Sequence, residues 1–123
     1  MGLASVSFRG SAPFEIISDV HNAGLSFIEW GSDVHAPRES TEMLSEIALM
    51  QSDYGIKTSS YGTYFCLGKD NPAELGRYIN AAKILGTDIL RVWCVDKCAE
   101  KYSECEKESF FVECLKWICL FIK

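Results

Sequence analysis

Positive charge is in short supply in this sequence. Its 123 residues include 12 Lys and Arg against 17 Asp and Glu, which gives a formal net charge of −5 at pH 7. Surfaces that bind nucleic acid are normally basic, so this balance argues against a nucleic-acid partner.

A glycine-rich phosphate-binding loop is also missing. The first strand-like run leads into Phe8-Arg9-Gly10-Ser11, which fits neither G-x-G-x-x-G nor G-x-x-x-x-G-K-[ST]. The dinucleotide-binding and P-loop alternatives therefore lose support. A flavodoxin-like open sheet, which needs no such motif, stays open.

The sequence has no signal-peptide pattern and no apolar run long enough to cross a bilayer. Met1 leads straight into a strand-like run, without the basic segment and apolar core of an export signal. Residues 110–122 are strongly apolar, but Glu113 and Lys116 interrupt them, and a membrane helix needs ~20 residues. We therefore expect a cytoplasmic protein without a membrane partner.

Cysteine is well represented, but its spacing matches no standard framework. The six cysteines are Cys66, Cys94, Cys98, Cys105, Cys114 and Cys119. Their even number is compatible with disulfides, yet no export signal accompanies them. Their spacing also differs from the paired C-x2–4-C units of structural zinc sites. Reduced thiols that pack as small apolar groups are the simplest interpretation.

Hydrophobic periodicity predicts four strands, each followed by a helix. The predicted strands are Ala4–Phe8, Phe27–Trp30, Ile56–Ser60 and Ile89–Cys94. The predicted helices begin near Pro13, Ser40 and Asn71 and end at Gly24, Gly55 and Gly86, with a last helix that presents Phe111, Leu115, Ile118 and Ile122 on one face. Residues 61–68, rich in aromatics and glycine, are expected to form a loop after the third strand.

This alternation of strands and helices implies a parallel α/β sheet. The strands begin at the spacing of βαβ units, so two closures fit the pattern. One is an open doubly wound sheet that is complete at this length. The other is a (βα)4 unit that forms the first half of an eight-stranded TIM barrel of ~250 residues.

Three segments suggest a family. Residues 28–37 (IEWGSDVHAP), 59–64 (SSYGTY) and 90–93 (LRVW) resemble the ends of the second, third and fourth strands of sugar phosphate isomerase/epimerases. These enzymes belong to the xylose-isomerase-like TIM barrel superfamily. The resemblance runs from about residue 3 to residue 95, with residues 28–37 as its most specific part. It implies that residues 1–123 are a partial barrel domain, of which residues 95–123 match less clearly.

The resemblance also implies a chemistry. Such enzymes bind a divalent metal, often Mn, Mg, Co or Zn, and interconvert or epimerise sugars through an enediolate. A carboxylate removes the proton next to the carbonyl. The metal-binding Glu, Asp, His and Glu of the family come from later strands, so no metal ligand or catalytic residue can be assigned in this chain. We expect this chain alone to bind no metal and to be inactive.

Five residues are predicted to contact a sugar or sugar-phosphate substrate. They are Glu29, His35, Tyr61, Arg91 and Trp93. All lie where a predicted strand ends, and in parallel α/β proteins that edge carries the site.

Each of these residues has a structural alternative. Glu29 and Arg91 could form a buried ion pair instead of binding substrate, or do both. His35 could be a loop histidine held by Asp33, and Tyr61 could lie on a surface loop. Trp93 could simply pack inside the barrel.

Three functional hypotheses remain at this stage. The first is half of a metal-dependent isomerase/epimerase. The second is a non-catalytic half-barrel that docks on a partner or forms a homo-oligomer, because unpaired edge strands and an open apolar face favour association. The third is a small open-sheet ligand-binding domain, which a strand order other than 1-2-3-4 would support.

Overall fold

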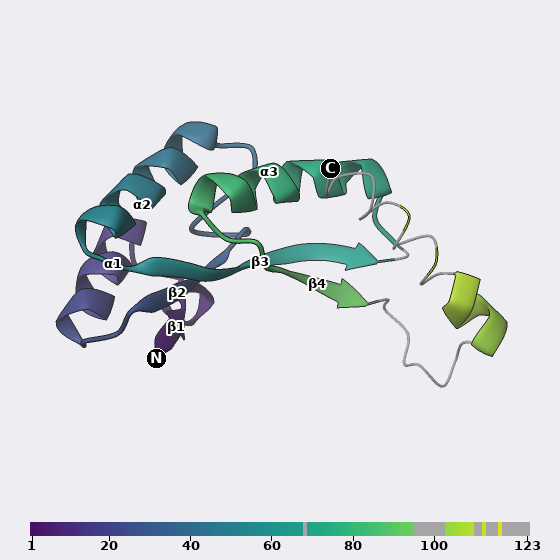
Figure 1. Cartoon of the computed structure of the whole chain (residues 1–123), viewed down its shortest axis with the longest axis horizontal. Coiled ribbons are helices and arrows are strands. Elements are labelled where there is room, and N and C mark those ends of the chain that lie inside the picture. The colour runs from purple at the N-terminus through teal and green to yellow at the C-terminus, as the bar shows by residue number, and fades with distance from the viewer. Residues whose placement is uncertain (68, 95–102, 110–111, 113–115, 117–123) are drawn as a thin grey trace.

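The computed structural model describes residues 1–67, 69–94, 103–109, 112 and 116. Strands and helices alternate along this part of the chain (Figure 1). The strands are β1 (Gly2–Ala4), β2 (Phe27–Gly31), β3 (Lys57–Leu67) and β4 (Leu90–Cys94). The α-helices are α1 (Pro13–Asn22), α2 (Thr41–Asp53) and α3 (Leu75–Leu85), and the 3-10 helices are η1 (Ser5–Phe8) and η2 (Pro72–Glu74). Residues 104–109 are also helical.

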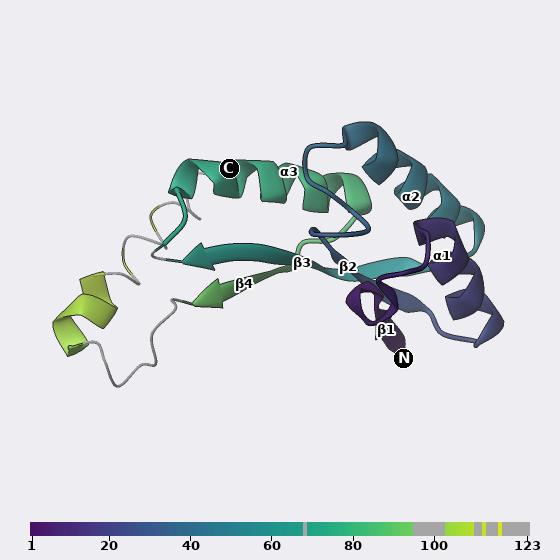
Figure 2. The same ribbon diagram turned by 180° about the vertical axis from the view of Figure 1, so that it is seen from behind.

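The four strands form one parallel sheet in the order β1-β2-β3-β4. Right-handed crossovers between neighbouring parallel strands place every connecting helix on the same side of a sheet. Figures 1 and 2 show α1, α2 and α3 together on one side of the strands. The (βα)4 prediction is confirmed. A doubly wound open sheet would be supported by a strand order other than 1-2-3-4, and the sheet does not have one.

The hydrophobic core lies between the sheet and the helix layer. Ile28 and Trp30 from β2 and Tyr61 and Phe65 from β3 are buried there. The helices contribute Ile16, Ile17, Val20, Leu44, Ile47, Leu75, Tyr78, Ala81, Ala82 and Leu85. A fully buried aliphatic or aromatic side chain contributes about 1.5–3 kcal/mol, so this layer holds the unit together.

The first predicted strand is displaced. Pairing with β2 covers only Gly2–Ala4, and Ser5–Phe8 turns into a 3-10 helix. The physical reason is the side chain of Ser5, whose Oγ accepts a hydrogen bond from the backbone N–H of Gly31 at 3.0 Å. This side chain takes the place that a backbone carbonyl would fill in a continuing strand.

The third strand is longer than predicted. Residues 61–67 continue β3 instead of forming a loop, and they pair with β4 from Tyr61↔Leu90 to Leu67↔Cys94. Aromatic residues favour strands, and the glycine that suggested a loop instead makes room for a side chain from β4. The ladder is irregular between Gly62 and Cys66, where Thr63 Oγ1 donates to the carbonyl of Arg91 at 2.8 Å.

The other predicted boundaries agree with the structure where it describes them. The glycines after α1, α2 and α3 all adopt positive φ, for example +77° at Gly86, which suits a left-handed helix end. The predicted helix that includes Phe111, Leu115, Ile118 and Ile122 lies outside the described residues. Cys66 and Cys105 carry free thiols. No helix among the described residues is long and apolar enough to span a membrane.

Candidate functional site

The sheet has one face without helices, and several of the predicted site residues lie on it. In β4, Leu90 and Val92 pack against the core, so Arg91, Trp93 and Ile89 just before the strand point to the opposite side. In β2, Ile28 and Trp30 are buried under the helices, which places Phe27 and Glu29 on that opposite side. We call this surface the helix-free face, defined by Phe27, Glu29, Ile89, Arg91 and Trp93.

Glu29 and Arg91 form a bidentate ion pair at the centre of the helix-free face. Arg91 Nη2 donates to Glu29 Oε1 at 3.0 Å, and Arg91 Nε donates to Oε2 at 3.3 Å. Ser60 Oγ from the intervening strand donates to the same Oε2 at 2.7 Å. Three neighbouring strands thus fix one carboxylate, and the ion pair expected as an alternative to substrate binding is present.

Gly62 provides the space for the Arg91 side chain. A Cβ atom at this position would lie 2.7 Å from Arg91 Nη2 and 3.4 Å from Glu29 Oε1. The first distance is shorter than real Cβ contacts, whereas the second is an ordinary van der Waals contact, so a side chain here would displace the guanidinium. The small residue within β3 is therefore part of the site.

The hydrogen bonds keep Glu29 ionised. Burial alone would raise the pKa of this carboxyl, but the hydrogen bonds from Arg91 and Ser60 outweigh it, and the pKa of Glu29 falls below its ordinary value. The pair is only partly buried, because the side chain of Arg91 keeps 40% of its accessible surface and that of Glu29 keeps 22%. The guanidinium can therefore be reached from the helix-free side.

Two half-exposed aromatic rings lie beside the ion pair. Tyr64 and Trp93 have ring centroids 6.3 Å apart with an angle of 30° between their planes. The guanidinium of Arg91 lies over the Trp93 ring, 5.6 Å from its centroid. Arg9 donates to the Tyr64 hydroxyl at 2.9 Å and forms an ion pair with Asp33. A cation, a carboxylate and an aromatic wall are the groups that can bind hydroxyls and one face of a sugar ring.

His35 is placed elsewhere. Its ring is buried beneath the turn after β1, 2% exposed. Nε2 lies 3.1 Å from the carbonyls of both Phe8 and Ser11, so it carries the proton and donates. Nδ1 accepts from Ser5 Oγ at 3.2 Å. Asp33, the expected partner, binds Arg9 instead, so this part of the prediction is wrong.

Tyr61 also lies outside the site. It points into the helix layer, is fully buried, and donates its hydroxyl to the carbonyl of Ala36 at 2.5 Å. Burial raises the pKa of its phenol far above the ordinary value. Neither the substrate contact nor the surface loop expected for Tyr61 agrees with this position. Tyr61 instead fixes the loop that follows β2.

Ser60 and Gly62 were not predicted as site residues. The signal was present, since Ser60, Gly62 and Tyr64 alternate along one strand and so share a face. It was missed because residues 61–68 were assigned to a loop, in which no face can be defined.

No metal site forms within the part of the chain that the structure describes. Nowhere in it do three or more His, Cys, Asp or Glu side chains gather as a group that could hold an ion. Glu29 already has its oxygens bonded to Arg91 and Ser60. The described residues therefore do not fit the metal that the resemblance implies.

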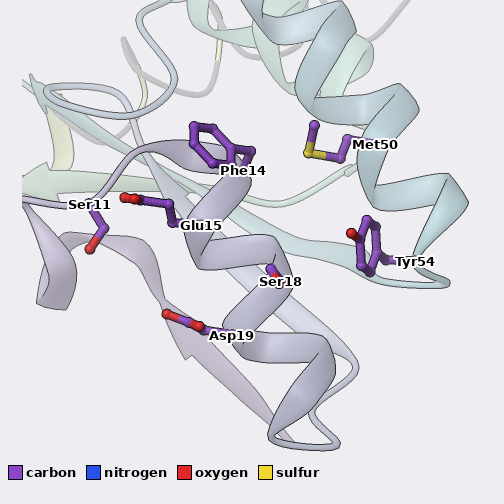
Figure 3. A pocket seen from close by; sticks show the side chains of 7 residues that line it. All are labelled: Ser11, Phe14, Glu15, Ser18, Asp19, Met50 and Tyr54. Carbon is purple, nitrogen blue, oxygen red and sulfur yellow. The ribbon is translucent and has the colours of Figure 1, made fainter.

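A groove of about 470 Å³ lies in the helix layer, between α1 and α2 (Figure 3). Its lining consists of Ser11, Phe14, Glu15, Ser18, Asp19, Met50 and Tyr54. Glu15 already accepts a hydrogen bond from the backbone N–H of Ala12 at 2.7 Å and so stabilises the start of α1. The groove shares no residue with the helix-free face, and we assign the site to that face.

Comparison with known proteins identifies the fold. No family model matches this chain, and no curated protein sequence matches it. Among solved structures, the probable 3-DHS dehydratase AsbF, involved in petrobactin synthesis, from Bacillus anthracis has a TM-score of 0.73 at 16% identity. D-psicose 3-epimerase, crystallised in the presence of D-fructose, has a TM-score of 0.71 at 18% identity.

This chain matches about half of each of these structures. The match covers 98% of this chain but only 47% of either neighbour. Both neighbours are xylose-isomerase-like TIM barrel enzymes. The chain thus has the fold of the N-terminal half of such a barrel, as the sequence predicted. In a barrel of this kind the helices lie outside, so the helix-free face corresponds to the interior.

Proposed function

We propose that this chain is the N-terminal, substrate-facing half of a metal-dependent sugar or sugar-phosphate isomerase or epimerase. The observation that carries the proposal is the Glu29–Arg91 pair on the helix-free face of a half-barrel. One structural neighbour is an epimerase and the other a dehydratase, and both have xylose-isomerase-like barrels. TIM barrel enzymes build their sites at the carboxyl ends of the strands, and Asp33 follows β2 and Trp93 lies near the end of β4.

Arg91 is the residue that we expect to contact substrate. Two of its donors are used by Glu29, and the remaining N–H groups can bind a hydroxyl, carbonyl or phosphate oxygen. Glu29 holds the guanidinium in position, and Trp93 offers an apolar wall beside it. We assign His35 and Tyr61 to positioning of the loops around the site, because both are buried and hydrogen-bonded within the protein.

The proton transfer belongs to the other half of the barrel. A divalent metal supplies Lewis-acid polarisation of the carbonyl in such enzymes. The described residues do not form a site for it. We expect the metal ligands, and with them the base that removes the proton, to come from the other half. The substrate would thus bind between the two halves.

The proposal is tested by assaying a panel of ketoses with added Mn²⁺. The 123-residue chain should show no turnover, whereas the native polypeptide from the source cell should epimerise or isomerise at least one sugar. In that polypeptide Arg91→Met should raise KM by about tenfold or more, as expected for loss of a charge-assisted hydrogen bond. Arg77→Met is the matched control, because Arg77 pairs with Glu74 on the outer helices.

Two results would contradict the proposal. One is turnover by the 123-residue chain alone, which would mean that the chemistry does not need a second half. The other is an active native polypeptide in which Arg91→Met and Arg77→Met have equal KM values. That result would remove the helix-free face from substrate binding.

A further inference from the structure

The helix-free face exposes large apolar side chains that a closed barrel would cover. Phe27 on β2, Ile89 just before β4 and Trp93 on β4 keep 40%, 59% and 49% of their surface accessible. Tyr64 lies beside Trp93 on the same side. Figures 1 and 2 show α2 and α3 on the other side of the strands. Large exposed apolar side chains gathered on one face of a sheet indicate a site of association.

The two edges of the sheet are complementary to each other. β1 and β4 are the outer strands of the order β1-β2-β3-β4, and each has one side without a strand partner in the described part of the chain. All four strands are parallel, so β4 of one copy can pair with β1 of another in the same parallel sense. A two-fold axis makes both junctions identical, and such an interface closes on itself.

The size of the unit agrees with this closure. The chain covers 47% of each structural neighbour, so two copies supply about the whole length of one barrel. Each copy brings four strands, and TIM barrels have eight.

The charges on the face do not oppose burial. Arg91 is already bonded to Glu29, and Arg9 to Asp33, so covering these arginines leaves neither without a counter-charge. Burying an unpaired charge would cost several kcal/mol, whereas a pair with its hydrogen bonds in place avoids most of that penalty.

We propose that a second copy of this chain binds the helix-free face of the 123-residue polypeptide and closes a two-fold barrel with β4 of each copy beside β1 of the other. This association goes beyond the proposed function and is independent of it. It describes what the 123-residue chain does in the absence of a C-terminal half, which would compete for the same face.

The test is the mass in solution across a concentration series, measured by sedimentation or by light scattering after gel filtration. The chain should form a dimer with twice the 13.8 kDa mass of one copy. Ile89→Glu should raise the dissociation constant of the dimer by about tenfold or more, because each copy would then bury a glutamate carboxylate in the interface. The matched control is Leu49→Glu, since Leu49 is 67% exposed on the outer helix α2 and should leave the constant unchanged. Far-UV circular dichroism checks that both variants fold.

Hydrogen exchange on the same samples locates the interface. Dimer formation should slow exchange of backbone amides in β1 and β4 and leave the groove between α1 and α2 unaffected. A monomer at all concentrations overturns the proposal, whether the face stays open or another segment of the same chain covers it. A dimer that Leu49→Glu disrupts and Ile89→Glu does not would place the contact on the helices and overturn it equally. Open-ended aggregates of no fixed size would also contradict a closed two-fold barrel.

Discussion

Among single residues, Glu29 is central to the site, because its carboxylate is held between Arg91 and Ser60. Three hydrogen bonds from two neighbouring strands reach this one group. The pair ties β2 to β4 across β3, and it orients the guanidinium that we assign to substrate binding. Two predictions follow from its geometry and its titration.

The first prediction concerns pH. The folded-state pKa of Glu29 lies below its ordinary value of 4.5, so the stabilisation is fully present above that value and is lost as the pH falls through the folded-state pKa. Acid should therefore lower the free energy of unfolding of the wild type more than that of Glu29→Gln. Denaturant titrations at neutral pH and below 4.5 measure this difference. Glu46→Gln, at an exposed position of α2, should retain the wild-type pH dependence. Equal losses in the wild type and Glu29→Gln would show that the ion pair does not stabilise the fold.

The second prediction concerns Gly62. A Cβ atom there would lie 2.7 Å from Arg91 Nη2, so Gly62→Ala should push the guanidinium away from Glu29 and lower the free energy of unfolding by about 1 kcal/mol. It should also reduce the pH-dependent part of the stability. Gly10→Ala is the control, because no atom lies within 4 Å of a Cβ at that position. If Gly62→Ala and Gly10→Ala have the same free energy of unfolding, the ion pair does not need the space at Gly62.

The sequence predicts part of this site and not the rest. Glu29 and Arg91 could be paired in advance because both lie on predicted strands of the same parallel sheet, the second and the fourth. Ser60 could not be chosen over Ser59, because an irregularity after Ile28 aligns Glu29 with Ser60 and leaves Ser59 without a partner in β2. A shift of one residue reverses which side chains share a face, and no local pattern announces it.

The positions of His35 and Tyr61 depend on contacts far away in the chain. His35 is held by Ser5 and Phe8, which the sequence predicts to lie in a strand, and by Ser11 in the turn that follows. Tyr61 is held by Ala36 in the loop after β2. The residue types alone were compatible with substrate contacts, and only the tertiary structure shows that these polar atoms are already bonded within the protein.

At the scale of elements, the helices were predicted better than the strands. Apolar residues at helical spacing and glycines in the left-handed conformation define α1, α2 and α3 within the chain itself. Strand limits instead depend on the partner strand. β1 is short because Ser5 bonds to Gly31, and β3 is long because β4 pairs with its second half.

A buried polar chain links these elements and gives a third prediction. Trp30 Nε1 on β2 donates to Gln51 Oε1 on α2 at 2.8 Å, and Gln51 Nε2 donates to Thr58 Oγ1 on β3 at 3.1 Å. Gln51→Leu leaves the indole N–H and the hydroxyl without partners, so the free energy of unfolding should fall by about 1–3 kcal/mol.

The control for this change is a leucine at an exposed site of the same helix. Glu46→Leu adds the same side chain to α2 without removing a buried partner and should change the stability little. Chemical denaturation monitored by the fluorescence of tryptophan gives both values. A Gln51→Leu protein as stable as the wild type would mean that packing of the leucine compensates for the lost hydrogen bonds.

The whole molecule is half of a closed architecture. Four parallel strands with helices on one side leave two edges and one apolar face without cover among the described residues. The structural neighbours show the same unit completed by as much chain again. We therefore expect this unit to be stable only when further βα units cover the helix-free face.

The mass of the native particle, isolated from the source cell without denaturation, tests this central claim most directly. The account predicts that the smallest stable particle containing this chain has at least twice the 13.8 kDa mass of one chain, whether as one longer polypeptide or as two copies. A stable, soluble particle of 13.8 kDa would contradict it, because the interior face of a half-barrel would then be exposed to water without consequence.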